Sequence, residues 1–421
     1  MITPIFSIKQ DDDFLFIDID ARYANIKETE IEYFDKIFFF SSSPYFLRLH
    51  FPCEIIDNEK GEANYDSENG KFLIKVPKKF HGEFFPNLEM ITELLKPSKI
   101  EADHLVQECG EENINDNEYY MEQTIEQKEL SPIDEVCKKF GYGFGWRRHN
   151  VLGKLIHEIG NLIDLKNPES VLIEERSSKC LQQDQISFRP EHYLADLYEK
   201  SDILDECLNF QLPEICFELS SKDREKLKEL GRRKIAILSD ACNHSVILSL
   251  IDILFAYLYD LRTTDGEHNV ESGWTIIKLS PTLTYLTRWK NAKEAITSAI
   301  RRALCYPLYR HWQLSLKVFD DIKRVISRGK VAILHCLCEI HYILAISGDF
   351  RYILNDLYLT DYCVWIQSVS DEKFVQLFDD LKAIKIEKRD VQLELCTLEI
   401  EAQISTLEIK ENIEEMDSDD E

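Results

Sequence analysis

The densest group of residues that could recognise another molecule lies in one short stretch, 301–314. It reads Arg-Arg-Ala-Leu-Cys-Tyr-Pro-Leu-Tyr-Arg-His-Trp-Gln-Leu. Arginine interleaved with aromatic residues is typical of nucleic-acid surfaces, because bases stack on aromatic rings and guanidinium groups stack on bases. The same residue types also form ordinary helix junctions, in which the aromatics pack inside and the arginines pair with carboxylates. Because Pro307 lacks an N–H group, we expect it to kink or restart the helix that contains Arg301 and Arg302.

The charge of the whole chain weakens the nucleic-acid interpretation of this stretch. Its 421 residues carry a formal net charge of −27. A protein of this charge repels both RNA and anionic membranes, and it attracts basic proteins. We therefore expect no direct contact with nucleic acid or with a membrane. The arginines of 301–310 should instead pair internally or meet acidic groups of a protein partner.

Motifs for catalysis, cofactors and metals are absent from the sequence. It contains no GxSxG, HExxH or Walker pattern, and the glycines of Tyr142–Gly145 do not have dinucleotide-binding spacing. His335, Cys338 and His341 would leave a zinc site one ligand short. The twelve cysteines include no CxxC pair, and no export signal precedes them. We predict a non-enzyme without cofactor or metal, located in the nucleoplasm and cytoplasm.

The N-terminal 95 residues have the pattern of an antiparallel β-sandwich. Short runs rich in β-branched and aromatic residues alternate with turn-forming clusters such as Ser41–Pro44. The predicted strands are Phe14–Asp20, Ile37–Phe40, Tyr45–Phe51 and Phe72–Val76. Side chains alternate clearly within the last two, which predicts one buried and one exposed face.

Beyond the sandwich, the composition predicts a linker, a helical domain and a tail. Residues 99–129 hold ten acids and two lysines, so we assign 96–130 to an acidic flexible linker. Residues 131–410 show successive helical patterns, including a buried helix around Val246–Leu261. Residues 411–421 are predicted to be an acidic disordered tail. The expected fold class is α+β multidomain, with an N-terminal antiparallel β-sandwich (1–95) and a large all-α domain.

Several segments resemble known families. The strands Tyr45–Phe51 and Leu73–Lys78 resemble the CS domain of co-chaperones and small heat-shock proteins. The segments His268–Pro281, Arg301–Leu314 and Phe350–Ile366, which follow such a sandwich and an acidic linker, closely resemble the Shq family. That family consists of assembly chaperones of H/ACA ribonucleoproteins.

The resemblance implies a function and partners. It implies a chaperone that clamps the free pseudouridine synthase of the H/ACA particle (dyskerin type) and covers its RNA-binding surface. An acidic chain suits such a role as an RNA mimic. The alternative is a general co-chaperone or adaptor whose CS domain contacts a heat-shock chaperone.

Two groups of residues are candidates for contacting the partner. Tyrosine, tryptophan and arginine dominate interface energetics, so we expect a specific interface among the aromatic and charged residues of the Shq-like segments. These are Arg301, Arg302, Tyr306, Tyr309, Arg310, Tyr358, Asp361, Tyr362 and Trp365. Packing between the domain's own helices is the alternative, above all for Tyr306 and Trp365. A less specific electrostatic contact is expected from the tail at Glu414, Glu415, Asp417, Asp419 and Asp420, where Ser418 is a candidate for an acid-directed kinase.

Overall fold

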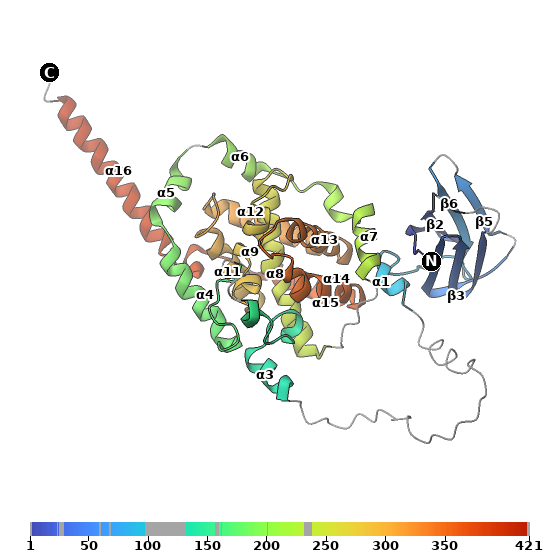
Figure 1. Ribbon diagram of the computed structural model, residues 1–421. Coiled ribbons are helices and arrows are strands. Elements are labelled where there is room, and N and C mark those ends of the chain that lie inside the picture. Colours follow the sequence, from blue (N-terminus) through green and yellow to red (C-terminus); the bar gives the residue numbers. More distant parts are fainter. Residues whose placement is uncertain are drawn as a thin grey trace. The chain divides into compact units, whose positions relative to one another are not determined.

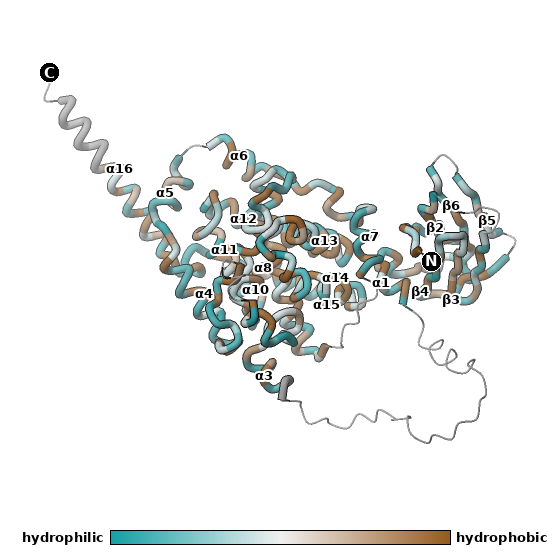
Figure 2. Tube along the Cα trace, in the orientation of Figure 1, coloured by the Kyte–Doolittle hydropathy of each residue, from teal (hydrophilic) through white to brown (hydrophobic). Residues whose placement is uncertain are grey.

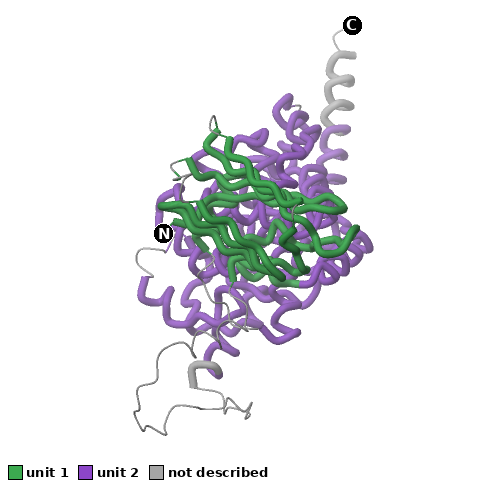
Figure 3. Tube along the Cα trace, turned by 90° about the vertical axis from the view of Figure 1, so that its right-hand side faces the viewer, with its two compact units in different colours: residues 1–131, 219–235, 363–369 green, residues 132–218, 236–362, 370–421 purple. Residues whose placement is uncertain are grey.

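The computed structural model describes most of the chain and divides it into two compact units. It describes residues 2–22, 24, 29–58, 60–66, 69–96, 132–155, 160, 162–199, 201–230 and 238–418, without the side chains of 132–134 and 408–418. Residues 97–130 of the predicted linker therefore lie outside the described residues. Figure 3 distinguishes unit 1 (Met1–Ser131, Leu219–Ile235, Cys363–Val369) from unit 2 (Pro132–Glu218, Ala236–Tyr362, Ser370–Glu421).

Unit 1 is built on two antiparallel sheets. The four-stranded sheet has the order β1 (Ile5–Gln10), β2 (Phe14–Asp20), β6 (Lys71–Pro77), β5 (Glu62–Asp66), and β3 (Glu30–Ser42) pairs with β4 (Tyr45–Ile55). Alternate side chains of β2 are buried, as the period of two requires. The rings of Phe40 in one sheet and Phe72 in the other lie 4.9 Å apart, edge to face. The structure thus confirms the antiparallel strands at the N-terminus.

The four predicted strands all fall within observed ones, but two strands were missed. Strands β1 and β5 lie at the two edges of the four-stranded sheet. In β5, the sequence Glu-Ala-Asn-Tyr-Asp has no buried residue and therefore no apolar face to detect. An edge strand of this kind is held by its backbone pairing with β6 and leaves little trace in a hydrophobic pattern.

Helical segments from distant parts of the sequence complete unit 1. They are α1 (Ile91–Leu94), α7 (Ser221–Leu230) and the C-terminal part of α14 (Thr360–Ser368). Arg224 of α7 pairs with Glu89 at 2.6 Å. The backbone N–H of Thr92 donates to Gln367 Oε1 at 2.9 Å in a buried site. Unit 1 therefore depends on segments that lie within the predicted helical region 131–410.

Unit 2 is helical, apart from an isolated bridge between Tyr142 and Arg148 among its described residues. Its elements are α3 (Pro132–Phe140), η2 (Phe144–Trp146), η3 (Leu152–Leu155), α4 (Ile173–Ser187), α5 (Pro190–Tyr198), α6 (Asp202–Asn209), η4 (Glu214–Phe217), α8 (Asp240–Thr263), α9 (Ser272–Leu279), α10 (Pro281–Thr284), α11 (Ala292–Ala303), α12 (Trp312–Ser327), α13 (Lys330–Ile346), the π-helical turn η5 (Asn355–Leu359), the start of α14, α15 (Asp371–Ala383), η6 (Lys388–Val391) and α16 (Leu395–Ser418). Figure 1 shows how they are arranged.

Helix α8 is the core of unit 2. It packs against α9, α11, α12 and α13, and every residue from 246 to 262 is buried. By length and apolarity alone it is the one described helix that could cross a membrane. Its burial on all sides, including the acidic Asp252 and Asp260, identifies a core helix, as the sequence predicts. Figure 2 shows more hydrophilic residues on the peripheral helices α4 and α5.

Two helical patterns of the sequence differ from the structure. Apolar residues recur at helical spacing from Val151 to Ile163 and predict a single helix, but the described part contains only the short 3-10 turn η3 and a non-helical end. The second pattern, from Trp274 to Leu286, predicts one helix, but the structure has two, because Ser280 caps α10 and Pro281 begins it. At Pro307, where a kink or a restart of the helix was expected, the structure has the restart. Eight residues of loop separate the end of α11 from the start of α12.

Candidate functional site

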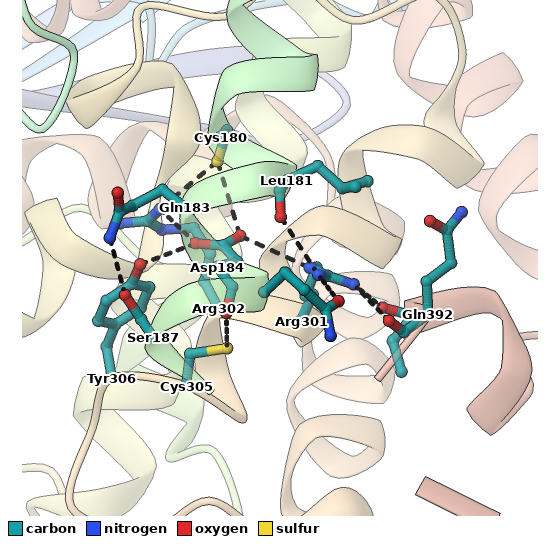
Figure 4. A network of polar contacts seen from close by, with 12 residues as sticks. Cys180, Leu181, Gln183, Asp184, Ser187, Arg301, Arg302, Cys305, Tyr306 and Gln392 are labelled. Carbon is teal, nitrogen blue, oxygen red and sulfur yellow. Dashed lines mark hydrogen bonds and ion pairs between the residues drawn. The ribbon is translucent and has the colours of Figure 1, made fainter. Parts of the chain in front are cut away.

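The two arginines at the C-terminal end of α11 point into the interior of unit 2. Arg301 is 2% exposed and Arg302 is fully buried. They extend toward α4, a helix that lies more than a hundred residues earlier in the sequence (Figure 4). Buried arginines need partners for their donors, and both side chains find them in this protein.

Arg302 is held by carboxylates on two sides. Its Nη1 lies 3.0 Å from Asp184 Oδ1, and its Nη2 lies 2.8 Å from Asp164 Oδ2. Its Nε donates to the Lys278 carbonyl at 2.6 Å. The Lys278 ammonium in turn pairs with Asp164 Oδ1 at 2.6 Å. Asp164 is therefore shared between two cations.

Asp184 is the second shared carboxylate. Besides Arg302, it lies 3.9 Å from Arg301 Nε and accepts the hydroxyl hydrogen of Tyr306 at 2.9 Å. Arg301 also donates to Gln185 Oε1 at 2.9 Å, as well as to backbone carbonyls. The ring of Tyr306 lies 4.5 Å from the Arg302 guanidinium and 4.8 Å from the Lys278 ammonium, so it adds cation–π contacts.

We call Asp164, Asp184, Lys278, Arg301 and Arg302 the charge cluster. It contains three cations and two carboxylates, so its formal charge is +1. Burial by itself lowers the pKa of Arg302, but the neighbouring carboxylates outweigh it and raise that pKa well above its ordinary value. The guanidinium therefore stays charged. Burial also raises the pKa of Asp184, against the opposing effect of Arg302.

A cavity of about 810 Å³ borders the charge cluster. The cluster residues Asp164 and Lys278 form part of its wall, next to the Tyr306 ring. The wall combines aromatic and apolar side chains with charged and polar ones. Its other lining residues are Gly160, Leu162, Ile163, Lys166, Gln183, Ser187, Trp274, Ile277, Tyr285, Asp349, Phe350 and Arg351. Pockets of this size accommodate small molecules or a few side chains of a peptide.

The loop after α13 brings a strained backbone to this cavity. Gly348, Asp349 and Phe350 have φ values of 72°, 49° and 58°, and for a bulky residue such as Phe350 this left-handed conformation is a genuine outlier. The preceding Ser347 lies so close to Gly273 that a Cβ there would be 2.6 Å from its Oγ. Backbone strain of this kind is concentrated at functional sites. Phe350 is 42% exposed in this loop.

Three other predicted interface residues, which come later in the sequence than the cluster arginines, are also buried. Tyr358 and Tyr362 are 3% and 1% exposed. The Tyr362 hydroxyl donates to the Val246 carbonyl at 2.9 Å, and its ring packs edge to face on Phe144. Trp365, in unit 1, is 6% exposed.

The prediction that these buried residues contact a partner needs a correction. Arg301, Arg302, Tyr358, Tyr362 and Trp365 do not present a surface to a partner in this structure. The physical reason is that aromatic rings and well-paired arginines are as suited to a protein interior as to an interface. The alternative of internal packing accounts for all five.

Four predicted residues are partly exposed. They are Tyr306, Tyr309, Arg310 and Asp361. The carbonyl of Tyr309 accepts from the Tyr259 hydroxyl, and the backbone N–H of Arg310 donates to Asp196 at 2.6 Å. Asp361 lies 4.0 Å from Arg148. Only Tyr306 among them reaches the cavity.

The tail residues are described only in part. Helix α16 extends to Ser418, so Glu414, Glu415, Asp417 and Ser418 lie on a helical backbone where the sequence predicts a disordered tail. Their side chains are outside the described part, and Asp419 and Asp420 lie outside the described residues altogether.

The acidic half of the charge cluster was not predicted from the sequence. Helix α4 was not predicted, because its buried positions include the charged residues Arg176 and Asp184 and its apolar stripe is therefore broken. Asp164 lies in the loop before it. A signal was available: Arg301 and Arg302 end an otherwise apolar helix face and require buried carboxylates from elsewhere in the chain.

Comparison with known proteins places these features in a family. A family model described as "SHQ1-like, CS domain" matches residues 3–95, and one described as "SHQ1 protein, Shq1 domain" matches residues 211–395. The chain is 40% identical to the Protein SHQ1 homolog of Caenorhabditis elegans over 436 residues, which cover 100% of this chain and 99% of that protein. It is 37% identical to the Mus musculus homolog (96% and 75% covered) and 30% identical to Protein shq1 of Schizosaccharomyces pombe (96% and 97% covered).

These matches span both units and include both predicted resemblances. The family is of the chaperone type and is not a known enzyme family. Family identity supports a role as an assembly factor. The chain belongs to the SHQ1 family.

Proposed function

We propose that this chain is an assembly chaperone for box H/ACA ribonucleoproteins. In this proposal it clamps the free pseudouridine synthase, of the dyskerin type, in the nucleoplasm and cytoplasm. It covers the RNA-binding surface of the synthase as an acidic RNA mimic, and so prevents aggregation and premature RNA binding. The family's role as an assembly factor and the chain's formal charge of −27 support this proposal.

The observation that carries the proposal is helix α16, which has an exposed apolar stripe that is followed in sequence by many acids. Figure 1 shows α16 extending away from the other helices of unit 2. Ile400, Ile404 and Leu407 are 57%, 50% and 59% exposed, and their spacing of four and three places them on one side of the helix. Residues 408–421 add eight acids and one lysine in sequence. An apolar stripe beside acidic residues suits a basic surface with an apolar centre.

The burial of several arginines is consistent with a negatively charged surface. Arg302 is bound by two internal carboxylates, and Arg301 is bound mainly by carbonyl oxygens. The buried Arg176 is bound only by backbone carbonyls among the hydrogen bonds of the described residues. These cations therefore do not offset the negative charge of the surface.

The proposal is tested with the full chain and the purified synthase. We expect binding that weakens as salt rises and that guide RNA competes away. Reversing three charges, as Glu414→Lys with Glu415→Lys and Asp417→Lys, should weaken binding about ten-fold, mainly by slowing association. The matched Gln and Asn substitutions should have a smaller effect. If binding is independent of salt and unaffected by guide RNA, the proposal is wrong.

One observation favours the alternative, in which the CS domain contacts a heat-shock chaperone. Phe16 and Leu73 are 37% and 44% exposed on the outer face of the four-stranded sheet, and Phe84 after it is 73% exposed. Phe16→Ser with Leu73→Ser removes apolar surface without touching the core. Such a variant should retain synthase binding under the proposal and lose its partner under the alternative.

Deleting the sandwich would be a poorer test of the two functions. Residues 219–235 and 363–369 form one compact unit with it, and both Arg224 and Gln367 have hydrogen-bond partners within 89–92. Truncation at residue 98 would strip these segments of their packing. Loss of binding by the truncated chain could then result either from the missing sandwich or from the disrupted packing of these segments.

A further inference from the structure

The charge cluster and the cavity beside it have a property that internal packing does not explain. Three cations share two carboxylates, so one positive charge has no partner within the cluster. Charges are rarely left uncompensated in a protein interior, because their desolvation is costly. In a chain that is otherwise strongly acidic, Lys278, whose carboxylate partner Asp164 is shared with Arg302, lies in the wall of a cavity of about 810 Å³.

Lys278 is the cation of the charge cluster that a molecule in the cavity can reach. Its side chain is 22% exposed, whereas Arg301 and Arg302 are almost completely buried. An ammonium group has three N–H donors, and the Asp164 carboxylate occupies one. Asp164 cannot neutralise both cations, since its other oxygen is bound to Arg302. Lys278 therefore has donors and charge to offer to a molecule in the cavity.

The rest of the wall adds apolar contact and little further charge. Trp274, Tyr285, Tyr306 and Phe350 supply aromatic surface. At the rim, Arg351 pairs with Asp349 at 3.3 Å, which leaves the exposed Lys166 as the remaining described cation of the lining. The backbone of Phe350 is strained, and its side chain lies in this wall.

We propose that this cavity binds an acidic peptide segment, in which a carboxylate pairs with Lys278 and a neighbouring aromatic or aliphatic side chain packs on the aromatic wall. The Lys278 ammonium already shares Asp164 with Arg302, so one added carboxylate complements it, whereas a phosphate would bring about two negative charges next to the lining carboxylates Asp164 and Asp349. The proposal goes beyond the chaperone function above, because the ligand is acidic whereas the expected synthase surface is basic.

The test compares two peptides that differ by one charge. Acetyl-Phe-Glu-amide and acetyl-Phe-Gln-amide are titrated into the full chain and followed by saturation-transfer NMR and calorimetry. We expect the Glu peptide to bind about ten-fold more tightly, because a charge-assisted hydrogen bond replaces a neutral one. This comparison needs no variant, so it holds even if a substitution at Lys278 harms folding.

Three variants then locate the site. Lys278→Met should reduce the affinity of the Glu peptide to that of the Gln peptide. Phe350→Ala should weaken both peptides by a similar factor. Lys293→Met is the control, since Lys293 pairs with Asp390 at 3.0 Å beside a different cavity, and it should change neither affinity.

Several results would overturn the proposal. Equal affinity for the two peptides, no binding of either up to about 10 mM, or a preference for Glu that survives Lys278→Met would each do so. Adenosine monophosphate is the competing probe. If it binds more tightly than the Glu peptide and loses affinity in Lys278→Met, the cavity is a nucleotide site and the peptide assignment is wrong.

Discussion

Replacing Asp184 by asparagine isolates the electrostatic part of the charge cluster. The amide has nearly the same shape, and its oxygen can still accept from Arg302 Nη1 and the Tyr306 hydroxyl, at 3.0 and 2.9 Å in the native protein. Its NH₂ group, however, would replace the Oδ2 that lies 3.9 Å from Arg301 Nε. The formal charge of the cluster would rise from +1 to +2 in a site where Asp184 is fully buried.

The expected loss of stability follows from two opposing effects. Removing one partner of a buried ion pair typically costs about 3–5 kcal/mol, because the remaining charge is uncompensated. Burial, which raises the pKa of Asp184, means that neutralising this carboxylate recovers part of its desolvation cost. We therefore expect the free energy of unfolding to fall by about 2–4 kcal/mol, which lowers the melting temperature by roughly 5–15 °C for a unit of this size.

The assay is urea and thermal unfolding followed by far-ultraviolet circular dichroism. Asp320→Asn is the matched control, since Asp320 forms an exposed pair with Lys323 at 3.0 Å and should cost less than about 0.5 kcal/mol. A change at Asp184 no larger than that of the control would refute the reasoning. A more stable variant would show that desolvation outweighs the ion pairs.

The remaining predictions concern two other positions in unit 2. Burial raises the pKa of Asp252 to about 6, although Ser280, Thr282 and Trp289 donate hydrogen bonds to it. Between this value and the pKa of about 4 in the unfolded state, the folded state holds a proton that the unfolded state has released. The free energy of unfolding of the native chain, measured relative to Asp252→Asn, should therefore fall by about 3 kcal/mol between pH 4 and 7. Urea titrations of both proteins at each pH measure this difference, and a rise over that range would contradict the prediction. Gly273→Ala should lower the unfolding free energy by about 1–3 kcal/mol, because its Cβ would meet Ser347 Cβ at 2.7 Å. Ser347→Gly in the same chain should restore most of that loss, and an unchanged loss would assign the effect to another contact.

Local patterns predicted much of the architecture. Alternation in β4 and β6 marks one buried face, and the apolar run of α8 marks a core helix, because burial of such surfaces is the dominant favourable term in folding. Pro190 occupies the first position of α5, where its missing N–H group costs no hydrogen bond, so it marks the start of that helix in the sequence. These features depend on neighbours in sequence, which is why the sequence alone specifies them.

Contacts between distant residues could not be obtained in this way. The sequence shows two adjacent arginines near Pro307, but only the fold brings Asp164, Asp184 and Lys278 to them from three other segments. The sequence alone determined that the chain is an acidic protein with a β-sandwich and a helical region. Tertiary structure decided that the arginines are internal and that Lys278, which shares a carboxylate with one of them, faces a cavity, because ion pairing and burial are properties of side chains that meet only after folding.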